Sequence, residues 1–136
     1  MAPPVPATVL VIEDDAALRE ALATVLREQG FVVVQAPSGA HAIRALHELR
    51  EDEHFCMVLL DMRLPEVDGI GVLRYLQQDA DQMPMIVALS ASRELLAQAI
   101  LVGVSVAIVK PLEVGDLLAI VARHCAREHS QPDIRG

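Results

Sequence analysis

The chain is poor in aromatic and in basic residues. Among its 136 residues there is no tryptophan, one tyrosine and two phenylalanines, so stacking surfaces for nucleobases or flavins are nearly absent. The formal net charge of −8 leaves no basic patch that could displace counterions from a polyanion. We therefore expect no direct contact with nucleic acid and no aromatic platform for a cofactor.

Cysteines and long apolar runs are also scarce. The two cysteines, Cys56 and Cys125, lack the spacing of a metal site or a disulfide framework, which is typical of reduced thiols. The first residues lack the basic start and apolar core of a signal peptide, and no apolar run reaches membrane-spanning length. These absences favour a cytoplasmic protein without membrane contact.

Short β-branched runs alternate with longer segments of helical period, and this pattern indicates repeated strand-helix units. Strands are expected at 8–13, 31–36, 56–60, 85–89 and 105–109, and helices at 15–29, 38–49, 71–78, 93–102 and 114–127. Because crossovers between parallel strands are right-handed, few topologies remain. We expect a flavodoxin-like α/β fold, with a five-stranded parallel sheet in the order 2-1-3-4-5 and five helices on both faces.

The same pattern predicts one domain over residues 8–127. Residues 1–7 are expected to form a flexible amino-terminal tail, and residues 128–136 a carboxy-terminal tail or the start of a linker.

Four of the expected strands end in polar side chains that suit phosphoryl chemistry. They are Glu13, Asp14 and Asp15 after the first strand, Asp61 after the third, Ser90 after the fourth and Lys110 after the fifth. Lys110 is the only lysine in the sequence. Because the carboxyl ends of parallel strands lie along one edge of a sheet, we expect these side chains to share one pocket.

Carboxylates that converge on one point repel one another unless a hard cation joins them. Mg²⁺ suits a site with few carboxylates, some waters and a phosphate oxygen, and Mn²⁺ is the alternative. Asp61, alone at the end of the central strand, is the best nucleophile for phosphorus, while Lys110 and Ser90 can neutralise or bond the phosphoryl oxygens. Pro111 follows the lysine, and we expect a cis peptide there.

The segments VLVIEDDAALREAL, LLDMRLPEVDG, ALSAS and VKP together resemble the four signature segments of response-regulator receiver domains of two-component signalling. The resemblance covers residues 8–127. It implies that Asp61 accepts a phosphoryl group and that Asp14 and Asp61 bind Mg²⁺ directly. The backbone carbonyl of Arg63 would be the third protein ligand, and Glu13 would act mostly through water.

The resemblance also assigns roles around the phosphoryl group. Ser90 is the switch hydroxyl, the backbone N–H of Ala91 is a second donor, and Lys110 pairs with the phosphoryl oxygens. Arg63 and Ser92 occupy positions that tune dephosphorylation. Three further residues, expected to shape turns around the site, are Pro65, Gly69 and Pro111.

One position departs from the family pattern. Receiver domains usually carry Tyr or Phe three residues before the lysine, whereas this chain has Ala107. The usual aromatic response to phosphorylation is therefore unavailable. Either backbone movement alone transmits the signal, or the domain works as a phosphate relay or sink.

A receiver domain is a signalling domain that promotes only its own phosphorylation and dephosphorylation. The resemblance implies a sensor histidine kinase or a phosphotransfer protein as donor. A downstream protein would bind the face formed by residues 93–102, 105–109 and 114–127, and a homodimer through that face is the alternative. The chain could stand alone or belong to a longer regulator or hybrid kinase.

Three other function classes fit the chain less well. A haloacid-dehalogenase-like phosphatase also uses an aspartate after a strand, but it needs a second acid two residues later, where this chain has Arg63. A flavodoxin-like cofactor carrier needs a phosphate loop and aromatic flanks. A phosphorylation-independent interaction module leaves the complete acidic and basic set unexplained.

Overall fold

The computed structural model of the protein describes residues 7–48, 55–78 and 83–129, and the side chains among them as far as His124. The terminal tails expected at 1–7 and 128–136 lie almost wholly outside these residues. The side chain of Cys125 also lies outside the described part of the chain. Cys56 is a buried free thiol. No helix in the described part of the chain has the length and hydropathy needed to cross a bilayer.

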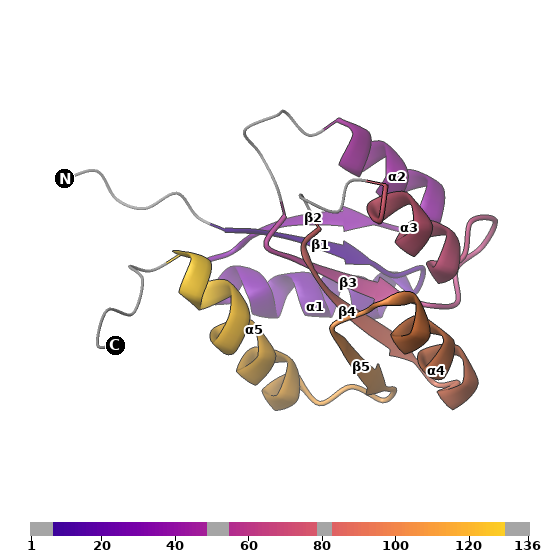
Figure 1. Ribbon diagram of the computed structural model, residues 1–136. Coiled ribbons are helices and arrows are strands. Elements are labelled where there is room, and N and C mark those ends of the chain that lie inside the picture. Colours follow the sequence, from indigo (N-terminus) through magenta and orange to yellow (C-terminus); the bar gives the residue numbers. More distant parts are fainter. Residues whose placement is uncertain (1–6, 49–54, 79–82, 130–136) are drawn as a thin grey trace, which may run out of the picture.

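Five parallel strands and five helices alternate along the chain (Figure 1). The strands are β1 (Thr8–Ile12), β2 (Val32–Ala36), β3 (Met57–Asp61), β4 (Met85–Ser90) and β5 (Val106–Val109). The helices are α1 (Ala16–Glu28), α2 (Gly39–His47), α3 (Gly69–Leu76), α4 (Arg93–Val102) and α5 (Val114–His129). The sheet order is β2-β1-β3-β4-β5, which confirms the predicted flavodoxin-like fold.

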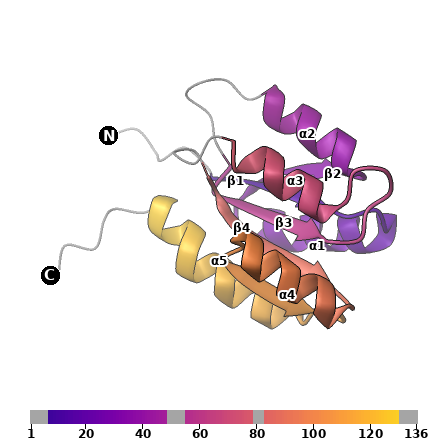
Figure 2. The ribbon, with the colours of Figure 1, turned by 45° about the vertical axis from the view of Figure 1, so that its right-hand side comes forward.

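Alternate residues of each strand supply two separate hydrophobic layers. Leu10 and Ile12 of β1 face the layer shared with α2, α3 and α4, whereas Val9 and Val11 face the layer shared with α1 and α5. Figures 1 and 2 show α2 and α3 on one side of the sheet and α1 on the other. All five residues of β3 are buried, as expected for a central strand covered on both faces.

Short polar side chains start four of the helices by accepting backbone N–H groups of the first turn. These capping residues are Asp15, Ser38, Asp68 and Ser92. Because Asp68 accepts the N–H of Gly71, α3 begins at Gly69 and not at residue 71 as predicted. Gly69 therefore lies in the first helical turn and not in the turn before it. The other boundaries differ from prediction by two residues or fewer.

The loop from Met62 to Asp68 is held by two close approaches of backbone. A Cβ atom on Gly39, the first residue of α2, would overlap the carbonyl oxygen of Val67 and lie 2.9 Å from its Cβ. A Cβ on Gly69 would lie 2.7 Å from the Cα of Met62. Since this loop directly follows Asp61, α2 helps to fix the end of β3.

A methyl group added at Gly39 should therefore destabilise the domain. We expect Gly39→Ala to lower the free energy of unfolding in urea by about 2 kcal/mol, because the loop backbone must shift. Gly115 of α5 is the matched control, since nothing lies within 4 Å of a Cβ there. Gly115→Ala should raise stability by up to about 1 kcal/mol through helix propensity. Equal effects of the two substitutions would contradict the close approach.

Candidate functional site

Three of the predicted side chains meet at the carboxyl edge of the sheet. The Nζ atom of Lys110 lies 2.7 Å from Oε1 of Glu13 and 3.1 Å from Oδ2 of Asp61. Glu13 is 1% exposed and Asp61 4% exposed, so the ammonium joins two buried carboxylates. The parallel topology produces this cluster, because β1, β3 and β5 all end on the same edge.

Asp61 has both carboxylate oxygens held. Oδ1 accepts a hydrogen bond from the backbone N–H of Arg63 at 2.9 Å, and Oδ2 accepts a hydrogen bond from the Lys110 ammonium. Asp61 is also the last residue of β3, so the sheet fixes its backbone. The carboxylate is thereby oriented before any ligand arrives.

Glu13 accepts more hydrogen bonds than the sequence suggested. Its Oε2 atom accepts the backbone N–H of Asp15 at 3.2 Å, while its Oε1 atom accepts from Lys110. Its carbonyl oxygen accepts a bond of 2.9 Å from Nη1 of Arg19. Sequence reasoning missed Arg19, although its place one turn after the Asp15 cap put it within reach of the end of β1.

The acidic residues that follow β1 have two different structural roles. One carboxylate oxygen from each of Glu13, Asp14 and Asp61 lies within 4.8 Å of the others, a spacing that a metal ion could bridge. Asp14 is exposed and reachable from solvent. Asp15 turns away to cap α1 by accepting the N–H groups of Ala17 and Leu18. The donors are hard oxygens, which fits Mg²⁺ or Mn²⁺.

The predicted switch hydroxyl is joined to the start of α4. Ser90 is 1% exposed, and its Oγ atom accepts the N–H of Ser92 at 3.0 Å. Ser92 in turn caps α4 by accepting the N–H of Leu95 at 3.2 Å. Among the described residues, no hydrogen bond connects the Ser90 hydroxyl with Asp61 or Lys110.

The remaining predicted residues surround this cluster. Arg63 and Pro65 are exposed on the loop after β3, and Ala107 is half-buried in β5, where it packs against the layer that includes α4. The bond between Lys110 and Pro111 is cis, as predicted. The N–H of Lys110 donates to the carbonyl oxygen of Ser90 at 2.9 Å, so the two strand ends are linked.

Burial and neighbouring charge change the titration of the cluster. Loss of hydration, and next the adjacent Asp61 carboxyl, raise the pKa of Glu13 from 4.5 to about 7, although the bonds from Lys110 and from the N–H of Asp15 act to lower it. Burial alone lowers the pKa of Lys110. Its bond to Glu13 and the charge of Asp61 outweigh this effect, so the pKa lies above its ordinary value.

Comparison with known proteins identifies the family of the chain. Residues 9–122 match the response regulator receiver domain family. The chain belongs to this family. It is therefore a signalling domain of two-component systems. Membership of this family excludes the haloacid-dehalogenase-like phosphatase and the flavodoxin-like cofactor carrier as alternatives.

Curated relatives of this receiver domain are longer proteins. The DNA-binding response regulator MtrA of Mycobacterium tuberculosis is 36% identical over 126 residues, which cover 91% of this chain and 53% of MtrA. The regulatory protein AtoC of Escherichia coli is 28% identical over 93% of this chain and 27% of its own length. The chain thus spans about half the length of MtrA and about a quarter of the length of AtoC. MtrA is described as a DNA-binding protein, so this relative does not support the expectation that the chain makes no direct contact with nucleic acid.

Solved structures agree on the fold of the receiver domain. A chain from the co-crystal structure of the Saccharomyces cerevisiae phosphotransfer protein Ypd1 with the receiver domain of Ssk1 has a TM-score of 0.81 at 21% identity. The match covers 98% of this chain and 97% of that one. A Francisella response regulator receiver domain has a TM-score of 0.77 at 24% identity, over 90% and 98% of the two chains.

The raised pKa of Glu13 predicts how stability depends on pH. Between pH 4.5 and about 7 the folded receiver retains a proton that the unfolded chain has lost, so this group favours folding less as pH rises. Without added metal, unfolding in urea should show a loss of about 1 to 3 kcal/mol over this interval relative to Glu13→Gln. Glu28→Gln, at the exposed end of α1, should follow the wild-type profile. Parallel profiles for wild type and Glu13→Gln would contradict this assignment.

Proposed function

We propose that this receiver domain accepts a phosphoryl group on Asp61 from the phosphohistidine of a sensor histidine kinase or phosphotransfer protein, with Mg²⁺ bound beside it. The observation that carries the proposal is the Lys110 ammonium bonded to both Glu13 and Asp61 within a group of oxygen donors. A cytoplasmic location is part of the same proposal.

The transfer itself needs little covalent help from the protein. An oxygen of Asp61 attacks phosphorus while the bond from phosphorus to the histidine nitrogen breaks, and the electron pair returns to the imidazole. The bond from Arg63 N–H to Oδ1 and the contact with Lys110 hold the carboxylate in place. Lys110 also balances charge that develops on the phosphoryl oxygens. Ser90 and the backbone N–H of Ala91 are the proposed donors to the remaining oxygens.

The metal site would use residues already held together. Asp14, Asp61 and the backbone carbonyl of Arg63 are the proposed direct ligands. Glu13 would act mostly through water, as the family resemblance implies, while its two carboxylate oxygens accept bonds from Lys110 and from the N–H of Asp15. When bound, Mg²⁺ supplies positive charge to the transferring phosphoryl group. Arg63 and Ser92 flank the site and are the proposed tuners of dephosphorylation.

Signal output would pass through α4, β5 and α5. Drawing Ser90 towards a phosphoryl group changes its bond to Ser92, and Ser92 caps α4. Since Ala107 provides no ring to follow this movement, backbone displacement carries the signal in this proposal. A phosphate relay or sink is the second candidate, favoured by the same Ala107.

The face carries exposed apolar residues for a protein partner or a homodimer. Ile100 is 58% exposed and Leu101 86% exposed on α4. The length of the relatives supports a further proposal, that the domain operates within a longer regulator or a hybrid kinase. The Ypd1–Ssk1 complex supports a phosphotransfer protein as donor.

Phosphorylation can be tested directly by intact-protein mass spectrometry. Incubation with acetyl phosphate and Mg²⁺ should add one phosphoryl group, and Asp61→Asn should abolish the addition because the nucleophile is lost. Asp68→Asn removes an equal charge at the cap of α3 and should leave the addition unchanged. An unchanged mass of the wild-type protein, with Mg²⁺ binding verified by calorimetry, would refute the proposal.

Metal binding separates the roles of two neighbouring aspartates. In calorimetric titration, Asp14→Asn should weaken Mg²⁺ binding by about 10-fold or more, because a direct ligand loses its charge. Asp15→Asn removes the same charge from the helix cap, where asparagine serves equally well, and should change binding by about 2-fold or less. Equal losses from the two substitutions would place the metal elsewhere.

A further inference from the structure

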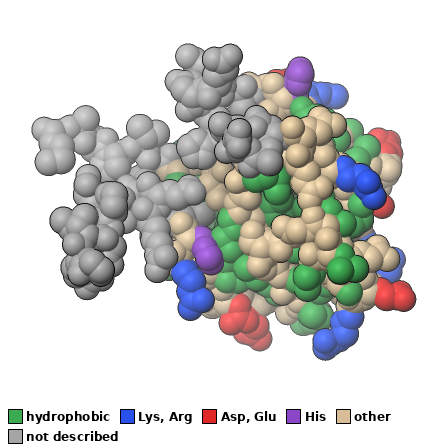
Figure 3. All heavy atoms as spheres, in the orientation of Figure 1, with side chains coloured by type: hydrophobic (Ala, Val, Ile, Leu, Met, Phe, Trp, Pro, Cys, Tyr) green, Lys and Arg blue, Asp and Glu red, His purple; other side chains and the backbone are tan. Residues whose placement is uncertain are grey.

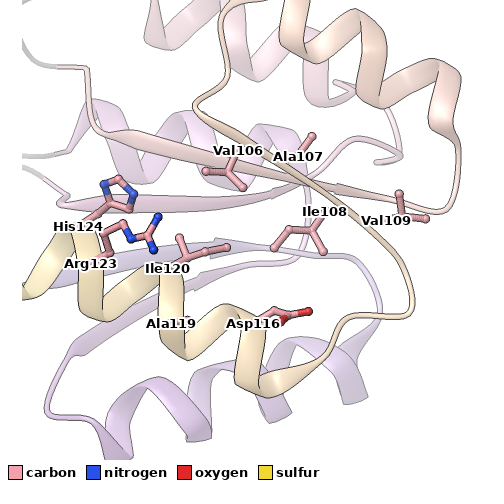
Figure 4. A pocket seen from close by; sticks show the side chains of 9 residues that line it. All are labelled: Val106, Ala107, Ile108, Val109, Asp116, Ala119, Ile120, Arg123 and His124. Atoms are coloured by element: carbon pink, nitrogen blue, oxygen red, sulfur yellow. The ribbon is translucent and has the colours of Figure 1, made fainter.

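A groove runs along the free edge of the sheet, between β5 and α5. It has a volume of about 580 Å³ and is lined by all four residues of β5 and by one face of α5. Figure 4 shows Ile108 of β5 directed to α5, and Ala107 to the opposite side. Since β5 is the terminal strand of the sheet, no other strand of the described chain pairs with its outer edge.

The four residues of β5 include none of the charged or proline side chains that usually protect an edge strand against strand addition. Natural edge strands carry charged residues, proline or bulges. Residues 106–109 are all apolar, and Val109 is 38% exposed. The lysine that follows is no protection, because its ammonium is bonded to Glu13 and Asp61 inside the site. Figure 3 shows hydrophobic side chains at the surface in this region, with charged ones around the margin.

The two ends of the groove carry opposite charges. Asp116 lies towards the Val109 end, while Arg123 and His124 lie towards the Val106 end (Figure 4). Ile108 and Ile120 line the groove between these ends. A complementary occupant is apolar in the middle, acidic at the Arg123 end and basic at the Asp116 end.

We propose that this groove binds an extended segment of a partner protein as a sixth strand on β5. The segment would alternate apolar and polar residues over the roughly 13 Å that four strand residues span. This inference rests on the proposed function, which assigns signal output to the face formed by α4, β5 and α5. The inference adds the kind of partner segment that binds there. Binding would reach the phosphorylation site through Lys110, which directly follows β5 and whose N–H bonds to Ser90.

A second copy of the chain fits this groove less well. Antiparallel pairing of two β5 strands about a twofold axis leaves both α5 helices on the same face of the joined sheet. Each α5 already lies beside its own β5, so the two helices would compete for the space next to the axis. A single extended segment needs only one strand spacing of about 5 Å.

The proposal can be tested with short peptides and ¹⁵N-labelled receiver domain. The first peptide is acetylated and amidated, with valines alternating with threonines between a terminal glutamate and a terminal lysine. Its addition should shift the amide resonances of residues 106–109 and slow their hydrogen exchange. Shifts confined to α1 or to the carboxyl edge of the sheet, or no shifts, would overturn the proposal.

Charge exchange tests which groove residues contact the peptide. Arg123→Glu should weaken binding of the first peptide by about two- to fivefold, as expected for a partly exposed ion pair. A second peptide with lysine at both ends should bind this variant more tightly than it binds the wild type. Ala122→Glu adds charge to α5 at an exposed position outside the groove lining and should leave both affinities unchanged. Equal weakening by Ala122→Glu would overturn the proposal.

The same measurements distinguish self-association from peptide binding, and a failure of the groove proposal from a failure of the proposed function. Concentration-dependent protection of the β5 amides without peptide, together with a doubled molecular mass in sedimentation, would assign the groove to a second copy and overturn the proposal. Peptide binding is measured on unphosphorylated protein, and phosphorylation by the mass assay. If the peptide does not bind but the protein is phosphorylated normally, only the proposal for the groove is rejected. If the peptide binds but the protein is not phosphorylated, only the phosphoacceptor role of Asp61 is rejected.

Discussion

A single ammonium group between two buried carboxylates is the interaction on which the rest of the site depends. Lys110 is separated from Glu13 by 97 residues and from Asp61 by 49, yet it bonds to both. Two carboxylates buried side by side would otherwise repel each other and lose hydration without compensation. Lys110 therefore stabilises the convergence of β1, β3 and β5 that the proposed phosphoryl and metal site requires.

The elements around this ion pair connect the site with the surface. The loop after Asp61 is closely packed against Gly69 and against the start of α2 at Gly39, so the proposed nucleophile is followed by a tightly held backbone. Ser90, in contrast, bonds to the residue that caps α4, and Lys110 directly follows β5. The side towards α2 and α3 is closely packed, while on the side towards α4 and β5 the hydrogen bonds of Ser90 and Lys110 can change partner. A two-state response is therefore expected on the second side.

Much of the fold followed from local patterns. Apolar runs separated by segments of helical period predicted every strand and helix, because buried parallel strands and amphipathic helices have different periods. The start of α3 was wrong because the cap at Asp68 was overlooked. Arg19 was missed because its bond goes to a backbone carbonyl, which leaves no pattern in side-chain types. The groove beside β5 depends on how α5 lies against the sheet edge, which periodicity does not describe.

The sequence by itself determined the class of fold, the receiver family and the residue types that end each strand, because strand order follows from connection rules and chemistry follows from side chains. Tertiary structure decided which of these side chains touch. It placed the only lysine between Glu13 and Asp61, left Asp14 open to solvent and turned Asp15 away as a helix cap. The physical reason is that contacts between distant strands depend on distances of a few ångströms, and spacing along a chain does not encode them.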